Sequence, residues 1–228
     1  MGQPIVIPPR HGEIIGDAPD RRVEILSDCD GLHATWSRFG PGRDGADLHI
    51  HYRHTDLFYV LEGELTMRLG AGGEEARAPA GALVRVPPGV VHGFRNAGDR
   101  EVRYLNLHAP GVGFADYMRA MRDGRSLSYD QFDPPEDGGR PITEVRIGAE
   151  EPVLADVEAI RIEVRSADAA PGADEHGVHS LYVLDGDLAL TVGDDRITAE
   201  PGTWIQIPAG TPHAADGAAR YLSISSPT

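Results

Sequence analysis

The sequence predicts an all-β protein, built from two antiparallel barrels that a short helical segment joins. Three observations predict this fold: short alternating segments occur along most of the chain, turn residues separate them, and one block of sequence occurs twice. The 228 residues include 28 glycines and 18 prolines, a composition that favours many tight turns. A chain of this length can form one large all-β domain or two small ones.

Six short segments are predicted as β-strands, because apolar and polar residues alternate in them or because they are apolar for four to six residues. They are LTMRLG at 65–70, LVRVPPG at 83–89, VRYLNLH at 102–108, AIRIEVRS at 159–166, LALTVG at 188–193 and TWIQIP at 203–208. Residues 113–123 instead predict a helix, whose apolar face consists of Phe114, Tyr117, Met118 and Met121. The Pro-, Gly- and Asp-rich stretch at 129–141 predicts a loop between two domains.

The internal repeat consists of two pairs of matching blocks. FYVLEGELTMRLG at 58–70 matches LYVLDGDLALTVG at 181–193, an offset of 181 − 58 = 123. GALVRVPPGVVH at 81–92 matches GTWIQIPAGTPH at 202–213, an offset of 202 − 81 = 121. The two-residue difference falls between the blocks, where a hairpin turn tolerates a deletion. Two copies of one β unit explain this pattern.

We therefore expect three parts in the chain. The first barrel spans 1–110 and carries the metal site discussed below, the helix and the Pro- and Gly-rich linker span 111–145, and a degenerate second barrel spans 146–228.

The charge and the cysteine content limit the expected partners. Lys and Arg number 21 and Asp and Glu 36, which gives a net charge of −15. Such a chain repels nucleic-acid phosphates and anionic lipids, so we expect neither nucleic acid nor a membrane as a partner. A single cysteine, Cys29, excludes an intrachain disulfide framework. No span of 18 apolar residues and no signal-peptide pattern occurs, so the expectation is a soluble cytoplasmic protein.

The stretch LHIHYRHTDLFYVLEGEL at 48–65 places three histidines and an aspartate ahead of a predicted hairpin. His49 and His51 are two residues apart in an expected strand, so their imidazoles point to one face and converge if that face lines a barrel. Asp56 opens the next strand, and His92 begins another after a Pro-Pro-Gly turn. Three imidazoles and one carboxylate leave open positions on a transition metal ion. For His54 we expect an exposed position in the turn.

The spacing of these residues carries a resemblance. Residues 49–63 read His-x-His, four residues, Asp56, six residues and Gly63, and residues 81–96 read Gly, five residues, Pro-x-Gly, two residues, His92, three residues and Asn96. This resembles the two-motif signature of the cupin superfamily. The resemblance implies six-stranded antiparallel jelly-roll barrels that hold a metal through two histidines and a glutamate of the first motif and one histidine of the second. With the repeat, it implies a bicupin.

The first motif departs from the family pattern at two positions. Asp56 stands where the family has glutamate, and Arg43 stands where it has a leading glycine. The ligand set implied by the resemblance is therefore His49, His51, Asp56 and His92. Asp56 either binds the metal directly or accepts a hydrogen bond that orients an imidazole, and it is the candidate catalytic residue. Iron, manganese, nickel, zinc and copper as divalent ions all accept this set.

The string HTDLFYVLEGEL, with the helix and DPPEDGG after it, resembles cupins that are compared with quercetin dioxygenases. This likeness implies a mononuclear metal-dependent oxygenase, an oxidoreductase acting on a small aromatic or enol-type compound. Two alternatives stay open: a Lewis-acid isomerase or lyase for a sugar-like or keto substrate, and a non-catalytic cupin that binds a small ligand. A basic cluster at the barrel mouth would favour phosphosugar chemistry, and the sequence shows no such cluster. The expected partner is a small-molecule substrate, and a homodimer stays open.

The repeat also predicts that the second barrel is mainly structural. His213 aligns with His92, but His179 stands in the position of Asp56. The positions of the two leading histidines hold Gly172 and Asp174, or Ala173 and Glu175 if the gap is one residue shorter. Since neither register restores a histidine pair, we expect one metal ion per chain. A different site made of His176, His179 and His213 stays open, although residues three apart in a strand point to opposite faces unless a bulge intervenes.

Overall fold

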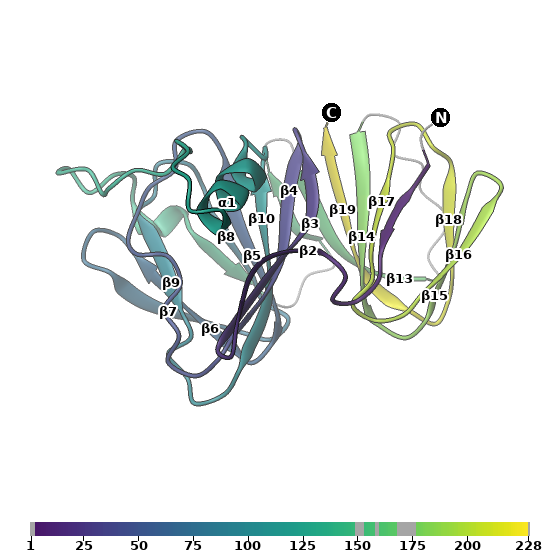
Figure 1. The fold of residues 1–228 in the computed structure, drawn as a ribbon, viewed down its shortest axis with the longest axis horizontal. Helices are drawn as coiled ribbons and strands as arrows, with labels where there is room; N and C mark the ends of the chain where they lie inside the picture. Colours follow the sequence, from purple (N-terminus) through teal and green to yellow (C-terminus); the bar gives the residue numbers. More distant parts are fainter. Residues whose placement is uncertain (1–2, 149–152, 158–159, 168–176, 228) are drawn as a thin grey trace. The chain divides into compact units, whose positions relative to one another are not determined.

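The fold consists almost entirely of antiparallel β-sheet, as the computed structural model in Figure 1 shows. The structure describes residues 3–148, 153–157, 160–167 and 177–227. The chain divides into two compact units: the first barrel, Glu13–Ala149, and the second barrel, Met1–Gly12 together with Glu150–Thr228. No helix among the described residues is long and apolar enough to span a membrane.

The first barrel contains two antiparallel sheets. The larger sheet has the order β11 (Arg146–Gly148), β8 (Leu83–Val86), β5 (Thr55–Glu62), β10 (Val102–Ala109), β4 (Leu32–Phe39), β3 (Arg21–Cys29) and β2 (Glu13–Ala18). The smaller sheet has the order β7 (Glu74–Pro79), β6 (Glu64–Leu69) and β9 (His92–Arg95). Apolar residues of both sheets form a single core, among them Val23, Phe58, Met67, Val84 and Tyr104. Their alternation along each strand is the reason that one face of each sheet is buried.

The second barrel is built in the same way. Its larger sheet has the order β1 (Ile5–Ile7), β17 (Trp204–Ile207), β14 (Gly177–Asp185), β19 (Arg220–Pro227), β13 (Ile160–Ser166) and β12 (Val153–Val157). Its smaller sheet has the order β16 (Asp195–Ala199), β15 (Leu188–Val192) and β18 (His213–Gly217). Leu181, Leu190, Ile205 and Tyr221 lie in its core.

The strand order confirms the repeat. The run β8-β5-β10-β4-β3 in the first barrel corresponds to β17-β14-β19-β13-β12 in the second. The two-residue offset lies in a hairpin: four residues, 70–73, join β6 to β7, whereas only 193–194 join β15 to β16. The predicted all-β fold of two antiparallel jelly-roll barrels is therefore confirmed.

A short strand borders each larger sheet beyond its repeated part. β11 pairs with β8, and β1 pairs with β17; Figure 1 draws β1 in dark purple beside β17. The structure thus groups the first twelve residues with the second barrel, whereas the sequence places them in the first. β1 thus pairs with a strand that lies about 200 positions later in the sequence.

The predicted helix at 113–123 is α1, Phe114–Arg122, and it is confirmed as the helical segment that follows the first barrel's strands. Ala115 and Met118 join the core of the first barrel. Arg119 donates to Glu13 of β2 and to Asp28 of β3, which fixes the outer face of the helix. The linker beyond α1 also contains a 3-10 turn, Ile142–Glu144.

Candidate metal centre

The first-motif histidines lie in an extended segment beside β9. His49 and His92 exchange backbone hydrogen bonds, each 2.9 Å, so the segment forms an isolated bridge here instead of the expected continuous strand. The same segment packs closely on β9, because a Cβ on Gly45 would overlap the ring of Phe94 and approach its backbone oxygen. The backbone ladder therefore brings the first and second motifs side by side.

The three histidines share one hydrogen-bonding pattern. Nδ1 of His49 donates to the backbone oxygen of Asp47 at 2.6 Å, and Nδ1 of His92 donates to that of Val90 at 3.0 Å. Nδ1 of His51 donates to the backbone oxygen of Asp130. Because a carbonyl oxygen only accepts, each Nδ1 carries the hydrogen and each Nε2 of the neutral ring has a free lone pair.

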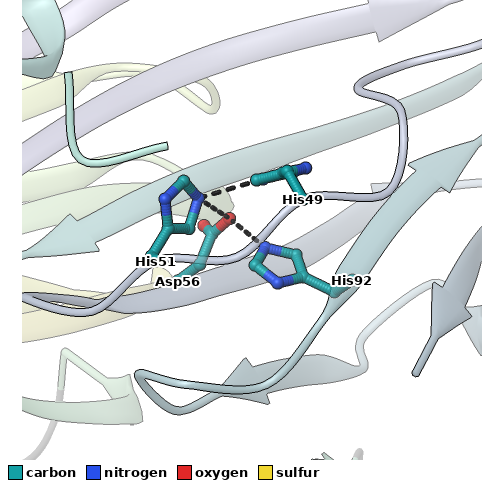
Figure 2. A group of neighbouring side chains, drawn as sticks. All are labelled: His49, His51, Asp56 and His92. Carbon is teal, nitrogen blue, oxygen red and sulfur yellow. Dashed lines mark hydrogen bonds and ion pairs between the residues drawn. The ribbon is translucent and has the colours of Figure 1, made fainter. Parts of the chain in front are cut away.

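These lone pairs point toward one another, as Figure 2 shows. Nε2 of His49 lies 3.0 Å from Nε2 of His51, and Nε2 of His92 lies 3.2 Å from Oδ2 of Asp56. Burial lowers the pKa of His49 to about 4 and that of His51 further, so both rings are neutral at pH 7 and no proton lies between their nitrogens. Two imidazole lone pairs that face each other at 3.0 Å repel unless a cation lies between them.

The donor set fits a single metal ion. One ligand atom from each of His49, His51, Asp56 and His92 lies within 4.8 Å of the others, and all four residues are buried. Two ligands that bind one ion at about 2.0–2.2 Å lie no more than about 4.4 Å apart, and Nε2 of His51 is 3.9 Å from Oδ2 of Asp56. This buried His/Asp cluster can hold a metal ion.

Asp56 is held from its other side as well. Its Oδ1 accepts a hydrogen bond from Nδ2 of Asn106 and lies 3.3 Å from Nε2 of His108. Burial acts to raise the pKa of the carboxyl, but the charges and hydrogen bonds of His108 and His92 outweigh it, so the pKa lies well below its usual range. Asp56 is therefore an ionised carboxylate with a fixed orientation, and its Oδ2 faces the imidazoles.

Two residues that sequence reasoning missed, Tyr129 and Asp130, extend this network. The hydroxyl of Tyr129 lies 2.7 Å from Nδ1 of His108 and 3.1 Å from Nε2 of His54. Nδ1 of His54 donates to Oδ2 of Asp130 at 3.0 Å. The expectation that His54 faces solvent is wrong: it is 1% exposed, because Asp130 and Tyr129 of the linker cover it. These partners of His54 lie about 75 positions away, so no local sequence pattern predicts the contacts.

A cavity of about 310 Å³ opens onto the metal-ligand cluster. Its aromatic and methionine walls come from Phe39, Phe94, Tyr104, Phe114, Tyr117, Met118 and Met121. This volume is at the small end of the range for ligand sites, about 300–1,000 Å³. Two arginines, Arg21 and Arg43, also line it. The sequence shows no basic cluster because 22 positions separate them.

In the second barrel His179 and His213 lie together, and its described residues do not complete the first barrel's ligand set. Nδ1 of His213 donates to the backbone oxygen of Thr211, so its Nε2 accepts a hydrogen bond from Nδ1 of His179 at 2.6 Å. Nε2 of His179 then accepts from the hydroxyl of Ser223 at 2.7 Å. His176 lies outside the described residues. A chain of ordinary hydrogen bonds thus accounts for the two described imidazoles.

Comparison with known proteins gives the family. The sequence matches the cupin domain over residues 35–108 and 162–225. A quercetin 2,3-dioxygenase from Bacillus subtilis (strain 168) is 31% identical over 110 residues, which is 48% of this chain and 32% of that protein. The matching region therefore spans about a third of the relative's length.

Solved structures share the fold across nearly the whole chain. Protein Ylba from E. coli has a TM-score of 0.72 at 16% identity and covers 99% of this chain and 91% of its own. A mutant of the salicylate 1,2-dioxygenase from Pseudoaminobacter salicylatoxidans has a TM-score of 0.63 at 15% identity and covers 90% of this chain and 76% of its own. At these identities the likeness concerns the fold alone. With a matched segment in each barrel and more than half of its length matched, the chain belongs to the cupin domain family and is a bicupin.

Proposed function

We propose that this bicupin is a mononuclear metal-dependent oxygenase of a small aromatic or enol-type compound, with one divalent transition metal held by His49, His51, Asp56 and His92. One observation carries the proposal: the Nε2 atoms of three buried histidines converge with a carboxylate, while the Nδ1 of each histidine donates a hydrogen bond to a backbone carbonyl. The likeness to a quercetin 2,3-dioxygenase supports oxygenase chemistry, and the aromatic cavity supports a planar substrate.

The protein's own residues hold and orient the reacting groups. A transition metal in this cluster supplies a Lewis acid that polarises a substrate oxygen, or a redox centre for a reaction with O₂. Asn106 and His108 keep the carboxylate of Asp56 in place. The hydroxyl of Tyr129 has one hydrogen for two imidazole nitrogens, so it donates to His108 or to His54 at any moment. The aromatic walls exclude water from the substrate.

The test combines metal analysis with oxygen consumption. Purified protein should contain about one equivalent of a redox-active metal, and it should consume O₂ when mixed with flavonols, catechols or hydroxybenzoates. A His49→Ala/His51→Ala variant should lose both the metal and the O₂ uptake. A protein that keeps its metal but consumes no O₂ with any of these compounds would contradict the oxygenase assignment and favour Lewis-acid chemistry or ligand binding. Full metal content in the double variant would contradict the site.

A further inference from the structure

Among the described residues, one cation that lines the cavity has no anionic partner. Arg21 is the first residue of β3 and lines the cavity together with Val23, which lies on the same face of the strand. Its guanidinium lies against Gly16 of β2, where Cζ is 3.8 Å from the site of a Cβ. Arg21 pairs in register with Phe39, which is itself part of the aromatic wall. The residue thus combines a charge with the wall of the substrate cavity.

The neighbouring arginines have carboxylate partners, although the Nε atoms of Arg38 and Arg43 also lack a hydrogen bond, whereas Arg21 has no carboxylate partner among the described residues. Arg22 bonds with Asp17 and Glu24, Arg38 with Glu101, and Arg43 with Asp20. In the part of the chain that the structure describes, no carboxylate lies within ion-pair distance of Arg21, and its buried Nε has no hydrogen-bond partner. A half-buried guanidinium with an unpaired N–H carries a desolvation cost that an anion in the cavity would offset.

We propose that Arg21 binds a carboxylate group of the substrate, so that the substrate is a small planar organic acid whose reacting part faces the His/Asp cluster. A guanidinium presents two parallel N–H groups that match the two oxygens of a carboxylate. A single unpaired cation in a chain with net charge −15 suits a singly charged acid better than a phosphate dianion. Naming this ligand a substrate rests on the function proposed above.

The other charges at the cavity are compatible with this assignment. Asp44 and Asp47 also line it, but both are exposed, so water screens their repulsion of an anion. Arg43 is already paired with Asp20. The inner end holds Asp56, whose oxygens contact Asn106, His92 and His108. An acid would therefore bind with its carboxylate at Arg21 and its uncharged part toward the cluster.

Calorimetric titration with two matched probes tests the assignment. Wild-type protein should bind benzoate more tightly than benzamide, which has the same shape and no charge. Arg21→Gln should weaken benzoate binding by about tenfold or more, the loss expected for one charge-assisted pair, and leave benzamide binding unchanged. Arg21→Lys should keep part of the preference for benzoate, because lysine keeps the positive charge but lacks the two parallel N–H groups of the guanidinium. Arg38→Gln is the control, because Arg38 pairs with Glu101 and does not line the cavity, and it should keep the wild-type preference.

Thermal unfolding and metal content of each variant separate this inference from the proposed function. Metal content should equal the wild-type value in Arg21→Gln, since the residue does not contact the metal-ligand cluster, and a cooperative thermal transition should show that the variant is folded. Equal benzoate affinities of wild type and a folded Arg21→Gln would overturn the inference, whatever the O₂ uptake shows. Absence of any preference for benzoate over benzamide in the wild type would overturn it too. Conversely, a protein without oxygenase activity that shows the charge-dependent binding would retain the anion site and lose only the proposed reaction.

Discussion

Replacing His92 with alanine is the sharpest perturbation of the proposed metal site. His92 supplies one of four convergent donor atoms and is 1% exposed. Removing a group that only orients a metal ligand costs about 10- to 100-fold in metal affinity, so the loss of a direct ligand should cost about 100-fold or more. A 100-fold loss equals about 2.7 kcal/mol. At about 2–4 °C per kcal/mol for chains of this size, the rise in Tm on adding metal should shrink by about 5–11 °C.

The assay is thermal unfolding with and without added metal, together with metal analysis of the protein as isolated. His33→Ala is the matched control, because His33 is also 1% exposed in the same barrel and lies outside the cluster. The metal-free Tm of each variant is its own reference, because His92 bonds to Val90 whereas neither ring nitrogen of His33 has a hydrogen-bond partner among the described residues. Only His92→Ala should lose the metal-dependent rise in Tm. An equal rise in both variants, or full metal occupancy in His92→Ala, would refute the assignment.

Three further predictions follow from the described contacts. Burial holds the pKa of His33 well below its usual 6.5, so below about pH 6.5 the unfolded chain binds a proton that the folded chain does not. The free energy of unfolding should therefore fall as the pH is lowered below about 6.5. In urea titrations, His33→Leu should reduce the slope of this free energy against pH by at most about 1.4 kcal/mol per pH unit. Gly45→Ala should lower the free energy of unfolding by about 1–3 kcal/mol, because the added Cβ would overlap the ring of Phe94 in β9. The control Gly72→Ala, which has open space around the added Cβ, should change this free energy by less than about 0.5 kcal/mol. The double variant His179→Ala/His213→Ala should keep the wild-type metal content, and a loss of half the metal would show a site in the second barrel.

The sequence predicts the parts of the fold that local patterns encode. Period-two alternation marks β6, β8 and β10, and the matching blocks mark their counterparts in the second barrel. The sequence of β10 also indicates which of its residues face the cavity. Tyr104, Asn106 and His108 place a polar group at every second residue, a pattern typical of a strand that lines a polar cavity.

Long-range contacts explain what the sequence does not predict. Asp130 reaches His54 from 76 positions away, and Tyr129 reaches it from 75. The composition of their segment predicts a loop, and composition says nothing about which barrel end a loop covers. The lack of a carboxylate near Arg21 is likewise a property of the tertiary arrangement. Motif spacing thus predicts the convergent ligands, while their supporting contacts require coordinates.

The pairing of β1 with β17 has a consequence for how the chain is made. On the ribosome, Ile5–Ile7 emerges before the residues of the first barrel, and its partner Trp204–Ile207 is synthesised about 200 residues later. At roughly 5–20 residues per second, the nascent strand waits for about 10–40 s without a partner. During that time Ile5 and Val6 present an unpaired, apolar strand edge, the kind of edge that promotes aggregation. The larger sheet of the second barrel therefore cannot be completed before Trp204–Ile207 has been synthesised, and until then the segment Ile5–Ile7 can pair with the strand edges of other chains.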